Sequence, residues 1–296
     1  MATRAQTIKT ATEQARKSWY EYTIRQEQEM LALYEGAAQK LIKEIQYNTK
    51  ADIIVKARRE TLLREINQQC NFLRASLNRK IRSGMSQSID LGLKSGIYTM
   101  NAVKLKGINV GTSYIGVDGN VRKYDAAQTT LNTSMWGRIN QDAMEYLVRY
   151  RPGGIEFSDS IWDATWEVQK QMRRMVNESV LLGKSSQNLA MRLTKYVSKT
   201  GLKTGPGIYK SAYANAWRLA RTEMNRAYTE GQIRYAGKKD FIDGFIWRTG
   251  NTDACHICRG LNGKFFPKDE VPEIPHPNCM CWREWHIKDE AIEEAA

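Results

Sequence analysis

Long apolar runs are absent from this sequence of 296 residues. No stretch approaches the roughly 20 consecutive apolar residues that a membrane-spanning helix needs. The beginning of the chain shows no apolar signal core either, because Arg4, Lys9 and Arg16 interrupt it with charge. We therefore expect a soluble protein that is made in a cytosol.

Proline is scarce, with six in the chain, and the first is Pro152. Because proline breaks helices, the first half of the chain is free to form long ones. Apolar residues recur there at spacings of three and four, which is typical of amphipathic helices. The pattern predicts two long helices, over roughly 5–47 and 51–95, that pack as a hairpin. A small β-hairpin or loop over about 105–123 and a third helix over about 125–149 should follow.

Cysteine and histidine are also few, with five and three residues. Four cysteines crowd into 255–281, and Cys70 stands alone on the apolar stripe of the second predicted helix. A disulfide-rich secreted protein usually spreads its cysteines along the chain, so this class is disfavoured. The distribution predicts a local metal site in a reducing compartment, with Cys70 as a packed core residue.

The second half of the chain begins at Pro152-Gly153-Gly154, which we interpret as a domain boundary. Helical spacing predicts helices over about 158–183, from 186 onward and over about 208–237, followed by short strands near 244–248, 264–266 and 281–285. The predicted fold class is mainly α, with long N-terminal helices and a small C-terminal α+β zinc-knuckle-like domain that contains short antiparallel strands. The predicted domains are an N-terminal partner-docking region, a C-terminal domain and an acidic, frayed tail, at 1–151, 152–288 and 289–296.

Tryptophans are expected to pack in cores rather than to bind ligands. Trp162 and Trp166 lie four residues apart, on one face of the helix predicted over 158–183. Four others are expected in the core that faces the cysteine cluster: Trp217, Trp247, Trp282 and Trp285.

The formal net charge is +13, and most of the excess lies in residues 1–150, which carry 23 Lys and Arg against 14 Asp and Glu. A basic surface attracts polyanions over a long range. Eight residues of the second helix could contact the phosphates of double-stranded DNA without reading its sequence. They are Lys56, Arg58, Arg59, Arg64, Arg74, Arg79, Lys80 and Arg82. The alternatives are contact with an acidic protein surface or with water.

Five residues near the C-terminus have the chemistry and spacing of metal ligands: Cys255, Cys258, His276, Cys279 and Cys281. A Cys-x-x-Cys turn brings two thiolates to one ion, and zinc suits a mixture of sulfur and imidazole. Two ligand sets fit: the four cysteines, or three cysteines with His276 in place of Cys279. Four protein ligands leave no open coordination position, so the predicted zinc is structural. The alternatives are disulfides or free thiols, and His256 is expected at the surface.

The cluster lies within a longer series of motifs. The series runs through Ala220-Arg221-Thr222-Glu223, Ala227-Tyr228, Gly231, Gly244, Trp247, Asp253, Cys255-His256-Ile257-Cys258, Leu261-Asn262-Gly263 and Pro275-His276-Pro277-Asn278-Cys279-Met280-Cys281. In this order they resemble the C-terminal domain of the phage Mu F-like minor head proteins, a family that includes the head morphogenesis protein of phage SPP1. The resemblance covers roughly residues 155–285. The family's usual pattern has an arginine between the last two cysteines, where this sequence has Met280.

The resemblance implies a structural minor head protein of a tailed bacteriophage rather than an enzyme. Its partners would be the portal protein and the major capsid or scaffold protein, with packaged double-stranded DNA as a further contact. It would lie in the head interior or at the portal vertex of the virion, and in the host cytoplasm during assembly. Two other functions remain as alternatives: a zinc-supported metal-dependent nuclease, and a zinc-supported DNA-binding regulator. Arg221 and Glu223 are two residues apart on a helix, so each is expected to need its own partner.

Overall fold

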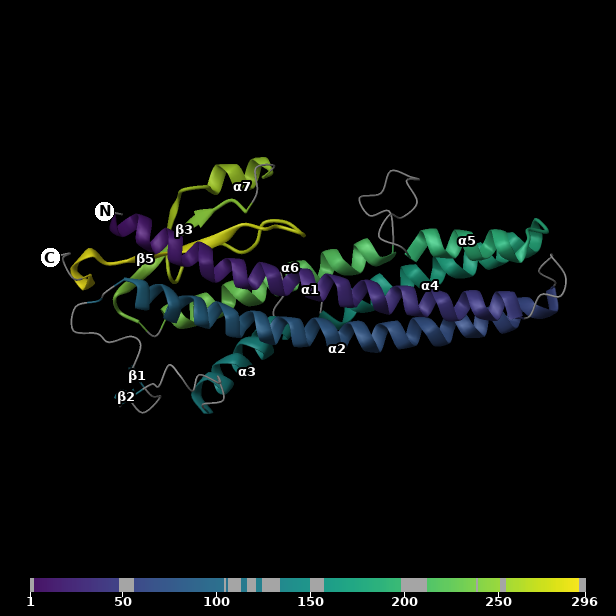
Figure 1. The fold of residues 1–296 in the computed structure, drawn as a ribbon, viewed down its shortest axis with the longest axis horizontal. Helices are drawn as coiled ribbons and strands as arrows, with labels where there is room; N and C mark the ends of the chain where they lie inside the picture. Colours follow the sequence, from purple (N-terminus) through teal and green to yellow (C-terminus); the bar gives the residue numbers. More distant parts are fainter. Residues whose placement is uncertain are drawn as a thin grey trace. The chain divides into compact units, whose positions relative to one another are not determined.

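The computed structural model describes residues 3–47, 56–103, 105, 113–115, 121–123, 134–149, 157–197, 212–237, 239–250 and 254–292 (Figure 1). The helices are α1 (Arg4–Tyr47), α2 (Lys56–Ala102), α3 (Ser134–Arg149), α4 (Phe157–Leu181), α5 (Ser186–Val197), α6 (Ala212–Ala236) and α7 (His256–Leu261), with the 3-10 helix η2 (Asp289–Ala291). The strands are β1 (Ser113–Ile115), β2 (Val121–Lys123), β3 (Ile242–Arg248), β4 (Phe265–Pro267) and β5 (Trp282–Ile287). This confirms the predicted fold class, with long N-terminal helices and a small C-terminal sheet. Within the described ranges, every helix is too short or too polar to span a membrane.

The chain forms two compact units, and each is assembled from separated segments. The first unit combines Met1–Thr23, Ser83–Tyr150 and Arg221–Ala296, and the second combines Ile24–Arg82 with Arg151–Ala220. The predicted boundary near Pro152 falls where the chain passes from one unit to the other. Each unit also includes residues from the other side of that boundary, so the units are not successive along the sequence.

Helices α1 and α2 lie antiparallel, as the predicted hairpin requires. In the first unit, the Trp19 indole donates to Ser88 Oγ at 3.1 Å, and the Tyr98 hydroxyl donates to Gln14 Oε1 at 2.7 Å. In the second unit, an ion pair joins Lys80 to Glu29. Partners near the start of α1 lie near the end of α2, which fixes the antiparallel direction. Helix α2 extends beyond the predicted end at residue 95, to Ala102.

Glycines allow α2 and α6 to approach closely within the first unit. A Cβ atom on Gly92 would lie 2.1 Å from the Tyr228 carbonyl oxygen, and one on Gly231 would lie 2.3 Å from the Ile89 carbonyl oxygen. Any larger side chain at either position would push the helices apart. The contact places α6 firmly against α2, and α6 in turn supports the C-terminal sheet.

The sheet has the order β4-β3-β5, and both pairings are antiparallel. Phe245 of β3 lies opposite Trp285 of β5, and the two rings pack at a centroid distance of 4.9 Å. Tyr235 of α6 meets the Trp285 ring edge-on at 5.6 Å. Trp247, Trp282 and Trp285 are buried as predicted, whereas Trp217 belongs to the second unit and is only partly buried.

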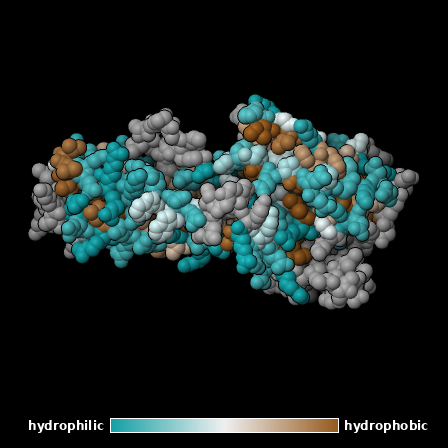
Figure 2. All heavy atoms as spheres, turned by 180° about the vertical axis from the view of Figure 1, so that it is seen from behind, coloured by the Kyte–Doolittle hydropathy of each residue, from teal (hydrophilic) through white to brown (hydrophobic). Residues whose placement is uncertain are grey.

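The prediction that Trp162 and Trp166 are core residues was wrong. They are 49% and 50% exposed, and their rings stack on each other at 6.3 Å with an interplanar angle of 11°. The buried stripe of α4 runs instead through Ile161, Val168 and Met172. Teal, hydrophilic residues cover most of the face shown in Figure 2, with apolar residues in separate groups.

Two predicted segments are only partly described. Strands β1 and β2 confirm a small hairpin between 105 and 123, while residues 116–120, which connect the two strands, lie outside the described residues. Helix α3 begins at Ser134, and residues 124–133, where the predicted helix began, also lie outside them. At the C-terminal end, η2 is followed by Ile292, which is buried and bridges to Leu105. Ile292 is therefore packed, whereas Asp289 and Glu290 are exposed and residues 293–296 of the predicted tail lie outside the described residues.

Candidate metal centre

The cysteine cluster lies in a small irregular region between β3 and β5 in the sequence. We call residues 254–281 the knuckle. Three of its cysteines are buried against Trp247 of β3, and a fourth lies at the edge of this cluster. All five cysteines of the chain are free thiols in the structure. Cys70 is 1% exposed, and burial raises its pKa to about 11, so it is an unreactive core residue as predicted.

The Cys-x-x-Cys pair is positioned by the start of α7. Cys255 is the N-cap residue of this helix, with extended backbone angles, and its sulfur accepts the backbone N–H of Cys258 at 3.4 Å. One helical turn then places the Cys258 side chain in the buried interior. Between them His256 is exposed, as predicted. The turn therefore presents two sulfur atoms toward the second half of the knuckle.

All five predicted ligands converge. Donor atoms of Cys255, Cys258 and His276 lie within 4.8 Å of one another, and so do those of Cys258, Cys279 and Cys281. Cys258 belongs to both groups. Its sulfur is 3.7 Å from Cys279 Sγ, close to the roughly 3.8 Å that separates two sulfurs bound tetrahedrally at 2.3 Å from one zinc. The cluster could therefore hold a metal ion.

His276 has the orientation of a metal-binding imidazole. Its Nδ1 lies 2.9 Å from the Pro277 carbonyl oxygen, which accepts a proton only if Nδ1 carries it. In the neutral ring with this tautomer, Nε2 is the nitrogen free to bind a metal, and it lies 3.2 Å from Cys258 Sγ. Metal-binding histidines usually hold their second ring nitrogen in this way. The geometry brings both predicted ligand sets together and leaves the choice between His276 and Cys279 open.

The second cysteine pair depends on two unusual backbone positions. Asn278 has a positive φ of 62°, which turns the chain immediately before Cys279. Gly250 lies so close to this turn that a Cβ atom there would be 1.9 Å from the Met280 carbonyl oxygen. The backbone N–H of Gly250 also hydrogen-bonds to Cys281, which lowers the pKa of that thiol. A glycine is therefore required at position 250.

The thiols have different pKa values because they share hydrogen bonds. The pKa of Cys281 is lowered to about 5, chiefly by a hydrogen bond from Cys279 and further by the Trp247 indole, which has no oxygen or nitrogen acceptor. The pKa of Cys279 is raised, because it donates that bond and is buried. Burial is also the first cause of the raised pKa of Cys258. The cluster thus favours one thiolate even when the other thiols keep their protons, and a thiolate is the form that binds metal.

Helix α6 supports the knuckle through its polar side chains. Arg221 Nε lies 2.8 Å from the Met280 sulfur, and Thr222 Oγ1 accepts the backbone N–H of Asn278 at 2.9 Å. Fully buried Asn225 donates to the carbonyl oxygens of Cys279 and Cys281 at 2.9 and 3.3 Å. Arg221 and Glu223 have separate partners, as predicted, since Glu223 pairs with Arg226 at 3.4 Å.

Two buried arginines lie near the second cysteine pair and donate to knuckle carbonyl oxygens. Arg16 of α1 donates to the Met280 carbonyl oxygen at 2.7 Å, and Arg283 of β5 donates to the Pro272 carbonyl oxygen at 2.8 Å. Arg16 is 8% exposed and Arg283 is 1% exposed, and burial lowers the pKa of each guanidinium group to about 10. Nearby Cys279 and Cys281 act in the opposite direction on both. Both guanidinium groups therefore remain charged beside the sulfur cluster.

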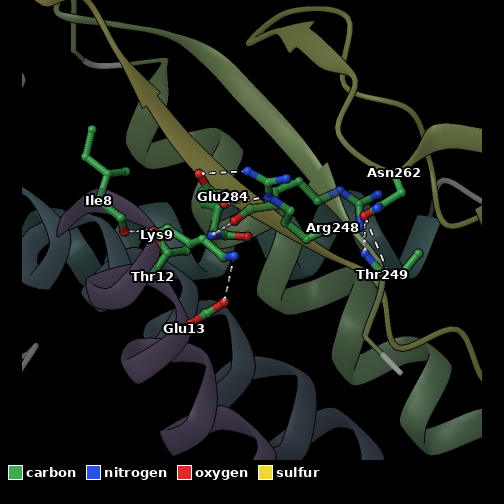
Figure 3. Close-up of polar contacts among 10 residues, drawn as sticks. Ile8, Lys9, Thr12, Glu13, Arg248, Thr249, Asn262 and Glu284 are labelled. Carbon is green, nitrogen blue, oxygen red and sulfur yellow. Dashed lines mark hydrogen bonds and ion pairs between the residues drawn. The ribbon is translucent and has the colours of Figure 1, made fainter. Parts of the chain in front are cut away.

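The first turns of α1 lie beside strands β3 and β5 (Figure 3). Figure 3 shows Lys9, Thr12 and Glu13 of α1 beside the ion pair between Arg248 of β3 and Glu284 of β5. That pair is bidentate, with distances of 2.6 and 3.2 Å, and Glu284 is 3% exposed.

The predicted phosphate-binding residues are spread along α2. The side chains of Lys56 and Arg58 are outside the part of the chain that the structure describes. Several others have partners within the chain: Arg59 with Asn177, Arg64 with Thr61, Arg74 with Thr165 and the Trp162 ring, Lys80 with Glu29, and Arg82 with Asn78. Arg79 is exposed. Contact with DNA stays a prediction for this set.

Comparison of the chain with protein-family models, with curated proteins and with solved structures found no match. The chemistry of the site therefore comes from its own residues. Sequence reasoning missed Arg16, Arg283 and Asn225. Asn225 lay within the helix that carries the family motif, but no local pattern links Arg16 to a turn 264 residues away.

Proposed function

We propose that the chain is a structural minor head protein of a tailed bacteriophage, and that its knuckle holds one structural zinc ion. The supporting observation is the meeting of the motifs that carry the family resemblance. Arg221 and Thr222 of α6 contact Met280 and Asn278 of the last motif. In a protein with an unrelated fold, nothing would require these separated motifs to form one site.

Zinc is the ion that best suits the donor set. Thiolates and imidazole bind zinc tightly, and up to four protein ligands close its coordination shell. A closed shell supports a structural role rather than a catalytic one. The knuckle contains one short strand, β4, and one short helix, α7, so a bound ion would supply much of its stability.

The proposed partners are the portal protein and the major capsid or scaffold protein, with packaged double-stranded DNA as a further contact. The proposed location is the head interior or the portal vertex. The long helices α1 and α2 offer an extended surface for docking, and the basic residues of α2 would favour a DNA-filled compartment.

The function is tested by deleting the gene from a phage that encodes this chain. Wild-type complementation should restore DNA-filled heads, and the chain should be found in purified heads. Cys258→Ser should restore few heads, while Cys70→Ser, a matched change far from the knuckle in sequence, should restore them normally. The proposal would be refuted if the deletion phage formed a normal number of heads and if the chain were absent from purified wild-type heads.

The nuclease alternative predicts a different result. Purified protein would then cleave plasmid DNA in the presence of magnesium, and His276→Ala would abolish the cleavage. We expect intact plasmid, because the knuckle donors would be occupied in holding the ion.

A further inference from the structure

We infer that Arg16 and Arg283 are the counter-charges of a metal–thiolate centre with net negative charge, so that metal binding and the docking of the start of α1 stabilise each other. This inference rests on the metal site of the proposed function and goes beyond it. It assigns a positioning role to a residue of the first helix, far from the knuckle in sequence.

The first argument is the charge of the bound site. A divalent ion with four thiolates carries a net charge of −2, and with three thiolates and a neutral imidazole it carries −1. Each thiol that binds the ion loses its proton to solvent. Either ligand set therefore leaves a buried anionic centre. Buried charges are stable only when paired, so such a centre needs cations near it.

The second argument is that the cations are present and lack other counter-ions. Neither Arg16 nor Arg283 forms an ion pair with a carboxylate in the described part of the chain. The Nη1 atoms of both, and Nε of Arg283, are buried without a hydrogen-bond acceptor. An unpaired buried guanidinium is costly, because its charge cannot be lost at ordinary pH.

The third argument is the placement of the two groups. Arg16 donates to the Met280 carbonyl oxygen, between Cys279 and Cys281, and Arg283 lies two residues after Cys281. Aromatic rings line the other sides. Arg16 lies 4.6 Å from the centre of the Trp19 ring, and Arg283 lies 3.8 Å from that of Trp247. The rings stabilise the cations in part by cation–π interaction but supply no full negative charge, which the metal–thiolate centre would provide.

The consequence concerns α1. Arg283 belongs to β5, which the sheet holds in place, whereas Arg16 belongs to a helix that reaches the knuckle only through tertiary contacts. A bound metal–thiolate centre would hold its negative charge fixed beside the buried Arg16 guanidinium, which has no carboxylate partner in the described part of the chain. The segment of α1 that carries Arg16 should therefore dock more tightly in the metal-loaded state.

The first experiment measures zinc affinity of the full chain by competition with a chromogenic chelator. Arg16→Met removes the charge and keeps a similar volume. We expect zinc to bind it about 10–100-fold more weakly, the usual effect of losing a group just outside the ligand set. Arg16→Lys should recover part of the loss. The matched control is Lys17→Met, an exposed neighbour on the same helix, which should bind within about twofold of wild type.

The second experiment separates charge from packing. Without metal, Arg16→Met should melt at or above the wild-type temperature, because it removes a buried charge that has no carboxylate partner. With zinc, it should melt below wild type. Hydrogen exchange should show that zinc protects residues 8–23 of wild type, and that this protection is reduced in Arg16→Met. Arg16→Gln serves the same purpose if the methionine variant does not fold.

The outcomes distinguish this inference from the proposal beneath it. A wild-type chain that binds no zinc overturns both the metal site and the counter-charge role. Stoichiometric zinc in wild type, with equal affinity in Arg16→Met and Lys17→Met, overturns the counter-charge role alone. Equal destabilisation of Arg16→Met with and without zinc does the same, since it indicates packing only.

Discussion

Replacement of Cys258 by serine should remove the metal and its contribution to stability. Cys258 is the only donor common to both groups of potential ligands, and it is 1% exposed. Its sulfur lies 3.2 Å from His276 Nε2 and 3.7 Å from Cys279 Sγ. A serine hydroxyl is similar in size but does not form the thiolate that zinc prefers. Both predicted ligand sets contain Cys258, so each of them loses a ligand in this variant.

The magnitude follows from linkage between binding and folding. At a free zinc concentration of 100 times the dissociation constant, binding stabilises the folded state by about 2.7 kcal/mol. For a unit of this size, that corresponds to a melting temperature about 5–10 °C higher. Wild type should lose this increment when a chelator is added, whereas Cys258→Ser should melt at the same temperature with and without zinc.

The assay is metal analysis of anaerobically purified protein, followed by thermal melting. We expect about one zinc per wild-type chain and none in Cys258→Ser. Cys70→Ser is the control, because it also buries a hydroxyl in place of a thiol, in the other unit, and should keep its zinc. Full zinc content in Cys258→Ser would refute the reasoning, as would a wild-type protein without metal.

Three further changes test other features of the structure. Gly250→Ala should weaken zinc binding and destabilise the protein by about 1–3 kcal/mol, because its Cβ would collide with the Met280 carbonyl oxygen. Arg248→Ala should lower the free energy of unfolding in denaturant by about 2–3 kcal/mol, because it leaves the Glu284 carboxylate buried without its partner. This loss lies at or below the lower end of the range that is usual for breaking a buried ion pair. Trp162→Ala should cost less than about 1 kcal/mol, because the side chain is half exposed.

Matched controls accompany these changes. Gly260→Ala, in a helix with open space around the added atom, should be neutral or slightly stabilising. Lys9→Ala breaks only a surface ion pair of 4.0 Å with Glu13 and should change stability by less than about 1 kcal/mol. Trp285→Ala should cost about 3–5 kcal/mol. Equal effects within a test and its control would contradict the corresponding contact.

Local patterns were sufficient to predict most elements of the fold. The spacing of apolar residues predicted α1 to within a residue or two, because an amphipathic stripe is a property of the helix itself. The same pattern failed for Trp162 and Trp166. A spacing of four places two side chains on one face, but it does not say which face another helix covers. In α4 the covered face is that of Ile161, Val168 and Met172.

The candidate site was predictable as a list of residues and not as a geometry. Cys-x-x-Cys and Cys-x-Cys are local signatures, so their convergence could be expected from chemistry. The supporting arginine Arg16 could not, because its role depends on a contact across 264 residues of chain. The two interleaved units were missed for the same reason, since a composition break such as Pro152 marks a linker but not its partners.

The interleaving of the units determines when each can fold during synthesis. The first unit requires residues 221–296, so its earliest segment must wait until most of the chain has left the ribosome. The second unit is complete once residue 220 has emerged. Such late closure raises the contact order of the first unit, and a slow final step of folding is expected there.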